Sequence, residues 1–122
     1  MLQKDDAEHP VPEHLRSTFH QIADALVDGD FQLKRHPTAR VRPVSKDTAQ
    51  WIAGNISAYG ETLAPLSDKT WERSVYLWMD GHWQVLVDLT TTAEPVSDLA
   101  LHANIYEAGD DLEVELYGVY VP

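Results

Sequence analysis

Three side chains in the second half of the chain are of types that bind metal ions or catalyse hydrolysis: His82, Asp88 and His102. Two histidines and a carboxylate can form a zinc or iron site, but the sequence has no compact ligand motif such as H-x-x-x-H or H-x-H. Ser97 with His102 and an aspartate has the composition of a hydrolase triad, but no G-x-S-x-G turn exposes the serine. The sequence also lacks a glycine-rich phosphate loop. We therefore expect a non-enzymatic protein with no catalytic residue, no metal and no cofactor.

Acidic residues dominate the last two-fifths of the chain. From Ser74 to Pro122 the sequence contains nine carboxylates and no lysine or arginine. The net charge of −11 would repel the phosphates of nucleic acids and anionic lipids, so we expect neither nucleic acid nor a membrane as partner. The acidic stretch has the alternation of β-strands, which distinguishes it from a disordered acidic tail. A basic protein is the expected partner.

Basic residues are concentrated elsewhere. Five of the nine lie within residues 34–46, KRHPTARVRPVSK. Two prolines and the absence of periodicity predict an extended linker between two helices. We expect these charges to pair with the acidic sheet of the same molecule. The alternative is a site for phosphate or for an acidic partner.

Two helices are predicted before the strands. Apolar residues spaced by three or four positions indicate a helix from about residue 12 or 13 to Asp28-Gly29. Ser45 is a good N-cap for a second helix, and Gly60 is placed to end it. Each helix has one narrow apolar stripe, which suits a layer packed on a sheet.

The rest of the chain predicts four strands. They form two consecutive β-hairpins, 74–78 with 82–89 and 98–106 with 111–121. We expect one α+β domain over residues 1–122, with a flexible N-terminus at 1–11. Both helices should pack on one face of a four-stranded antiparallel sheet.

The register of the first hairpin decides which side chains share a face. Met79-Asp80-Gly81 fits a three-residue loop with glycine in the left-handed position. That loop pairs Trp78 with His82 and places Tyr76 and Trp78 on the mixed face of the sheet. A two-residue Asp-Gly loop would instead place Tyr76 beside Val85 and Trp78 beside Trp83, and would leave the two faces equally apolar. We prefer the three-residue loop because it segregates the faces.

These registers give an apolar face and a mixed face. The apolar face, which includes Trp83, should form the core under the helices. The mixed face combines aromatic, amide, histidine and carboxylate side chains, which is typical of a protein-binding surface. Its alternatives are a solvated face stabilised by cross-strand pairs and a small-molecule site built on Trp78. The predicted partner-binding residues are Tyr76, Trp78, His82, Asp88, His102, Tyr106, Glu113, Glu115 and Tyr117.

The stretch from TWERSVYLWMDGHWQVLVDL through SDLALHANIYE to YGVYVP resembles an uncharacterised family of small acidic bacterial domains, over roughly residues 40–122. In size, acidity and lack of an active-site motif the chain also resembles the immunity proteins of bacterial toxin systems. That resemblance implies an inhibitor of a basic, nuclease-like toxin, and the runner-up is a small-molecule or regulatory ligand-binding domain. The N-terminal MLQKDDAEHP has no apolar run, so we expect a cytoplasmic protein, as a monomer or weak dimer.

Overall fold

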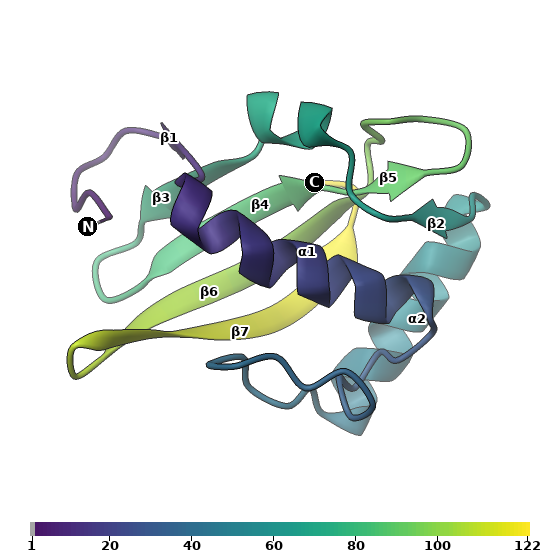
Figure 1. The fold of residues 1–122 in the computed structure, drawn as a ribbon, viewed down its shortest axis with the longest axis horizontal. Helices are drawn as coiled ribbons and strands as arrows, with labels where there is room; N and C mark the ends of the chain where they lie inside the picture. Colours follow the sequence, from purple (N-terminus) through teal and green to yellow (C-terminus); the bar gives the residue numbers. More distant parts are fainter. Residues whose placement is uncertain (1) are drawn as a thin grey trace.

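Figure 1 shows a computed structural model of the protein, which describes residues 2–122. A five-stranded antiparallel sheet of order β1-β3-β4-β6-β7 forms its centre, and β2 and β5 form a separate two-stranded sheet. The protein is therefore α+β, as predicted, with one strand more in the main sheet than expected. The elements are β1 (His9–Pro10), α1 (Glu13–Val27), α2 (Lys46–Tyr59), β2 (Leu63–Ala64), a 3-10 helix (Asp68–Glu72), β3 (Val75–Trp78), β4 (Trp83–Asp88), β5 (Thr90–Thr91), β6 (Ala100–Ala108) and β7 (Asp111–Tyr120).

Helix α1 covers one face of the main sheet. Its bounds agree with the prediction, because Gly29 follows the helix with φ +74°, a conformation that glycine adopts without strain. The predicted stripe of Leu15, Phe19, Ile22 and Leu26 is buried in the same apolar cluster as the sheet residue Trp83. We call this face of the sheet the core face.

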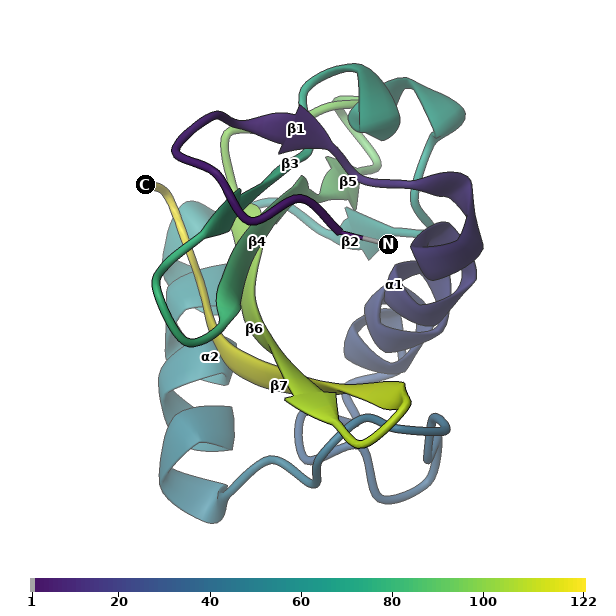
Figure 2. The same ribbon diagram turned by 90° about the vertical axis from the view of Figure 1, so that its left-hand side faces the viewer.

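Helix α2 lies on the opposite side, so the prediction that both helices pack on one face is wrong (Figure 2). Its ends are as predicted: the Ser45 hydroxyl accepts a hydrogen bond from the Thr48 amide, and Gly60 ends the helix at φ +84°. The helix packs beside β7, where Asn55 Nδ2 donates to the Val119 carbonyl at 3.0 Å. Helix α2 thereby binds backbone near the end of a strand that would otherwise have a free edge.

The first hairpin adopts the register that the sequence argument rejected. Trp78 pairs with Trp83, and Tyr76 pairs with Val85, so both aromatic residues belong to the core face. The Met79 amide donates to the His82 carbonyl at 2.8 Å across a two-residue loop, in which both residues have positive φ. The prediction failed because all four residues of β3 are apolar, so alternation within the strand carries no information about its register.

A β-bulge in β7 changes which side chains face the core. His102 pairs with Gly118, whereas the next residue, Ala103, pairs with Leu116, so Tyr117 is the extra residue. Beyond the bulge the alternation is shifted by one position, so Val119 is fully buried, whereas unbroken alternation would place it on the same face as Tyr117.

The N-terminal segment packs on the end of the core face that α1 leaves free. Leu2 is buried, the Gln3 amide donates to the Tyr76 hydroxyl, and Trp83 Nε1 donates to the Gln3 carbonyl, each hydrogen bond at 2.9 Å. β1 extends the sheet by pairing with β3. Residues 2–11, for which we predicted flexibility, thus make specific contacts with strands β3 and β4.

The basic linker supplies a partner for the other edge of the sheet. The Arg42 amide donates to the Val114 carbonyl, and the Val114 amide donates to the Arg40 carbonyl, both at 2.8 Å. The Arg40 guanidinium also forms an ion pair with Asp111 at 2.8 Å. The predicted pairing of this segment with the acidic sheet is confirmed for its two central arginines, Arg40 and Arg42.

Candidate functional site: the outer face of the sheet

The sheet face opposite α1 is the candidate site, and we call it the outer face. Seven of the nine predicted site residues lie on it: His82, Asp88, His102, Tyr106, Glu113, Glu115 and Tyr117. Tyr76 and Trp78 lie on the core face instead, where the Trp78 ring packs 4.9 Å from Trp83 and under the Lys4 ammonium at 5.0 Å. In their place β3 contributes Val75 and Leu77, both half-buried.

A band of aromatic rings crosses the outer face from the first hairpin to α2. His82 lies 5.4 Å from Tyr106, and the Tyr117 ring lies 5.9 Å from His102. His102 stacks on Tyr120 at 3.6 Å, and Tyr120 in turn contacts Trp51 of α2 at 5.3 Å.

Trp51 is 48% exposed, although it is among the largest apolar side chains in the protein. Sequence reasoning missed its role because a single tryptophan in a helix usually signals packing. The informative signal was Gly118, since only a residue without a side chain lets a ring lie so close to the strand. A Cβ at Gly118 would come within 2.7 Å of the Trp51 ring.

The carboxylates of the outer face are held by arginines of the same molecule. Arg42 pairs with both Glu113 and Glu115, the latter at 3.2 Å, and its guanidinium lies 4.6 Å above the Tyr106 ring. The hydrogen bond that Arg42 donates to the Glu113 carboxylate raises the pKa of Arg42 further above its ordinary value. One cation shared by two carboxylates leaves this cluster with an excess of one negative charge.

Asp88 occupies the other end of the face. Arg73 Nε lies 3.3 Å from its carboxylate, which is only 14% exposed. Burial raises the pKa of Asp88, and the charge of Arg73 opposes that rise. The predicted anionic face is therefore half neutralised by two arginines that come from outside the acidic stretch.

His102 is the one buried side chain among the seven predicted site residues on the outer face. Its Nε2 lies 3.2 Å from the Tyr120 carbonyl and must donate to it, which leaves Nδ1 as the unprotonated nitrogen of a neutral ring. Nδ1 is buried with no hydrogen-bond partner among residues 2–122. Burial accordingly lowers the pKa of His102. The His102 ring packs against Tyr117 and Tyr120 and presents no nitrogen to solvent.

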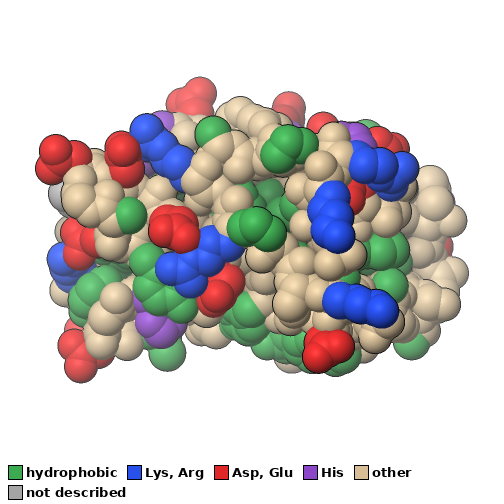
Figure 3. All heavy atoms as spheres, turned by 90° about the horizontal axis from the view of Figure 1, so that it is seen from below, with side chains coloured by type: hydrophobic (Ala, Val, Ile, Leu, Met, Phe, Trp, Pro, Cys, Tyr) green, Lys and Arg blue, Asp and Glu red, His purple; other side chains and the backbone are tan. Residues whose placement is uncertain are grey.

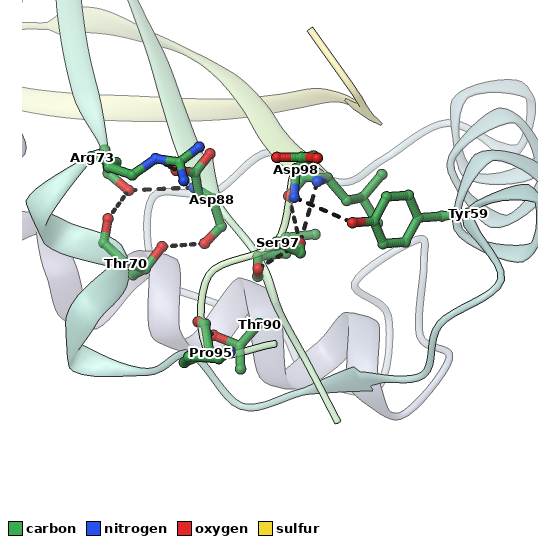
Figure 4. Close-up of polar contacts among 11 residues, drawn as sticks. Tyr59, Thr70, Arg73, Asp88, Thr90, Pro95, Ser97 and Asp98 are labelled. Carbon is green, nitrogen blue, oxygen red and sulfur yellow. Dashed lines mark hydrogen bonds and ion pairs between the residues drawn. The ribbon is translucent and has the colours of Figure 1, made fainter. Parts of the chain in front are cut away.

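The serine that could have formed a triad with His102 has a structural role (Figure 4). Ser97 is fully buried, and its hydroxyl donates to the Leu89 carbonyl at 2.7 Å. The Asp98 amide nearby donates to the Tyr59 hydroxyl at 3.3 Å, which connects this loop to α2. Ser97 thus holds the segment between β5 and β6 in place.

Two searches of the described part of the chain, residues 2–122, complete the description of the site. They reveal no cluster of three or more histidine, aspartate or glutamate side chains arranged to hold a metal ion. Over the same residues, no helix has the length and apolar character needed to cross a bilayer.

Comparison with protein families gives one match. Residues 23–122 match the family described as Domain of unknown function (DUF7668). The chain belongs to this family. The matched range of the DUF7668 domain begins within α1 and includes β3, β4, β6 and β7, but not β1. No curated protein and no solved structure matches the chain.

Proposed function

We propose that this DUF7668 protein is a non-enzymatic binding protein that docks a basic protein partner on its outer face. In the finer form of the proposal it is an inhibitor or immunity protein that neutralises a basic, nuclease-like bacterial toxin. The observation that carries the proposal is the outer face itself: β3, β4, β6 and β7 present half-buried apolar and aromatic side chains, and α2 packs beside β7 at one side of this face.

The edges of the sheet are less suited to binding than this face. The linker at Arg40–Arg42 covers one half of β7, α2 packs beside the other half, and β1 pairs with β3. A partner that added a strand to β3 or β7 would have to displace one of these segments, and β1 itself offers an edge of only two residues. A partner that lay flat on the face would meet Leu77, Leu86 and Tyr106 without any rearrangement.

Charge supports a cationic partner, through a different set of carboxylates from the one that the sequence suggested. Glu113, Glu115 and Asp88 are engaged with arginines, but Asp80 and Asp98 near the two ends of the face are exposed and form no ion pair in the described structure. Together with the net charge of −11 they favour the approach of a basic protein.

The Trp78 position does not support the alternative of a small-molecule domain. Trp78 packs against Trp83 and under Lys4 on the core face, so it cannot form an aromatic cage with tyrosines of the outer face. A ligand site would have to lie elsewhere on the molecule.

Binding kinetics with a basic toxin domain encoded beside this gene would test the proposal. Leu86→Arg puts a positive charge in the middle of the face, and we expect it to weaken binding about tenfold or more, mainly through faster dissociation. Gln21→Arg adds the same charge on the exposed side of α1 and is the matched control. The double variant Asp80→Asn, Asp98→Asn should slow association at low salt and leave dissociation almost unchanged.

Two results would overturn the proposal. One is binding that Leu86→Arg and Gln21→Arg weaken equally, since the face would then play no special part. The other is an association rate that is indifferent both to salt and to the loss of Asp80 and Asp98. Circular dichroism of Leu86→Arg shows whether the variant is folded before its kinetics are compared.

A further inference from the structure

A cavity of about 460 Å³ lies between the loop that follows α1 and the side of α2, away from the outer face. Its size is in the range of pockets that hold small molecules. Its floor is apolar and is formed by Phe31, Ala49 and Ala53. Three basic residues line it: Lys34, Arg35 and Lys46.

These three cations are not used elsewhere in the fold. Four of the protein's basic residues, Lys4, Arg40, Arg42 and Arg73, form ion pairs with carboxylates. In the described residues none of the three cavity cations forms an ion pair, and the only side-chain hydrogen bond among them runs from Arg35 to the Asp28 carbonyl at 3.0 Å. In a protein with 20 acidic residues, such a concentration of free positive charge is conspicuous.

Figure 3 views the molecule from the side of this loop. On the right, basic side chains lie around an area of tan and green atoms with acidic side chains at its margin, whereas on the left a basic side chain lies directly between acidic ones. The middle and the ends of the basic linker thus differ: Arg40 and Arg42 in the middle are neutralised by β7, whereas Lys34, Arg35 and Lys46 at the two ends remain open.

The one carboxylate in the cavity lining, that of Asp30, stabilises the loop through hydrogen bonds to its backbone. Asp30 is buried, and its oxygens accept hydrogen bonds from the amides of Lys34, Arg35 and His36 at 2.8–3.0 Å and contact His36 Nδ1 at 3.1 Å. Burial raises the pKa of Asp30, but these hydrogen bonds outweigh it and keep the pKa below its ordinary value. Asp30 therefore folds the loop around itself and fixes the backbone from which Lys34 and Arg35 extend.

We propose that this cavity binds a small organic phosphate: an anionic group held by Lys34, Arg35 and Lys46, and an apolar or aromatic body seated on Phe31, Ala49 and Ala53. A phosphate monoester fits better than a monocarboxylate, because its charge near −2 complements several cations and its oxygens suit the fork of Arg35. The site is separate from the outer face and requires no protein partner.

The test uses 1-naphthyl phosphate as a probe, titrated into the ¹⁵N-labelled protein at low ionic strength. We expect binding in about the millimolar range, with amide shifts concentrated in residues 29–35 and 46–53. Inorganic phosphate and 1-naphthol each contain half of the recognised chemistry, so each should bind more weakly than the probe. Raising the salt concentration should weaken the binding of 1-naphthyl phosphate and leave the binding of 1-naphthol almost unchanged.

A matched pair of variants assigns the binding to the cavity. The double variant Lys34→Gln, Lys46→Gln should lower the affinity for the probe about tenfold. Lys69→Gln removes an exposed lysine that lies outside the cavity and forms no ion pair in the described residues, and it should leave the affinity unchanged. The proposal is overturned if Lys69→Gln weakens binding as much per charge, if inorganic phosphate binds as tightly as the probe, or if about 10 mM probe leaves the cavity amides unmoved.

Discussion

The two faces of the main sheet are built from the same strands and differ sharply in burial. On the core face, Trp83 is fully buried beneath the N-terminal segment, and Val87 and Leu101 are fully buried as well. On the outer face, their neighbours Gln84 and Leu86 are only half-buried, and polar side chains stand between the apolar ones. The stability of the domain therefore depends mainly on one face. The other face carries apolar surface that folding leaves partly exposed, which is the condition for a binding surface.

Truncating one large residue on each face is the strongest test of this difference. Trp83→Ala should lower the free energy of unfolding by about 3–5 kcal/mol, because it opens a cavity beside Ile105 and removes the hydrogen bond to Gln3. Leu86→Ala should cost only about 1 kcal/mol, since water already reaches its side chain. Urea denaturation of both variants measures the two losses.

Trp78→Ala adds an intermediate point to that comparison. Trp78 is half-buried on the core face and packs on Trp83, so its loss should fall between the other two. Equal losses for Trp83→Ala and Leu86→Ala would contradict the division of the sheet into a core face and an outer face.

A second experiment probes the place where α2 joins the outer face. Gly118→Ala puts a methyl group within 2.7 Å of the Trp51 ring and 2.8 Å of the Tyr120 ring, and we expect a loss of about 1–2 kcal/mol from overpacking. Trp51→Ala alone should cost less because its ring is half-exposed. In the Trp51→Ala background, Gly118→Ala should cost less than in the wild type, and the cost that remains comes from the contact with the Tyr120 ring. A cost that stays the same in both backgrounds would show that Trp51 is not what excludes a side chain at position 118.

Local signals predicted the two α-helices and the four longest strands, but not the two-residue strands β1, β2 and β5 or the 3-10 helix. The capping serine at Ser45 and the glycines Gly29 and Gly60 lie where the sequence argument put them, because caps and left-handed residues act within one turn of the chain. The predicted pairing of the basic linker with the acidic sheet was also correct at Arg40 and Arg42, since charges of opposite sign in one small domain tend to meet.

Long-range packing could not be predicted in the same way. Whether the loop before β4 has two or three residues decides which side chains of β3 face the core. Val75 and Tyr76 point to opposite faces and are both apolar, so hydrophobicity does not distinguish the two registers. The bulge at Tyr117 and the packing of α2 opposite α1 depend on contacts between segments far apart in sequence, such as Trp51 with Gly118. For the same reason the cavity beside Lys34 and Lys46 was visible from sequence only as a cluster of charge.

The smallest expected effect concerns the pH dependence of stability, and it comes from His102. In the folded state its Nε2 donates to the Tyr120 carbonyl, and protonation of the buried Nδ1 would create an N–H group with no acceptor. Burial therefore lowers the pKa of His102 below 6.5, whereas the unfolded chain takes up the proton near 6.5. The stabilising contribution of the neutral ring is complete above pH 6.5 and is lost as the pH falls through the lowered folded pKa.

Urea unfolding at pH 7.5, 6.5 and 5.5 should show this loss in the wild type and a shallower slope in His102→Gln, which cannot take up the proton. His82→Gln is the matched control, because it removes a histidine whose ring on the same face is open to water. The raised pKa of Asp88 acts in the opposite sense, because a carboxyl that protonates more readily in the folded state stabilises that state as the pH falls. The comparison of wild type with His102→Gln isolates the contribution of His102 from that of Asp88. If His102→Gln keeps the full slope of the wild type, the buried imidazole does not couple protonation to folding, and the aromatic band from Tyr117 to Trp51 rests on stacking alone.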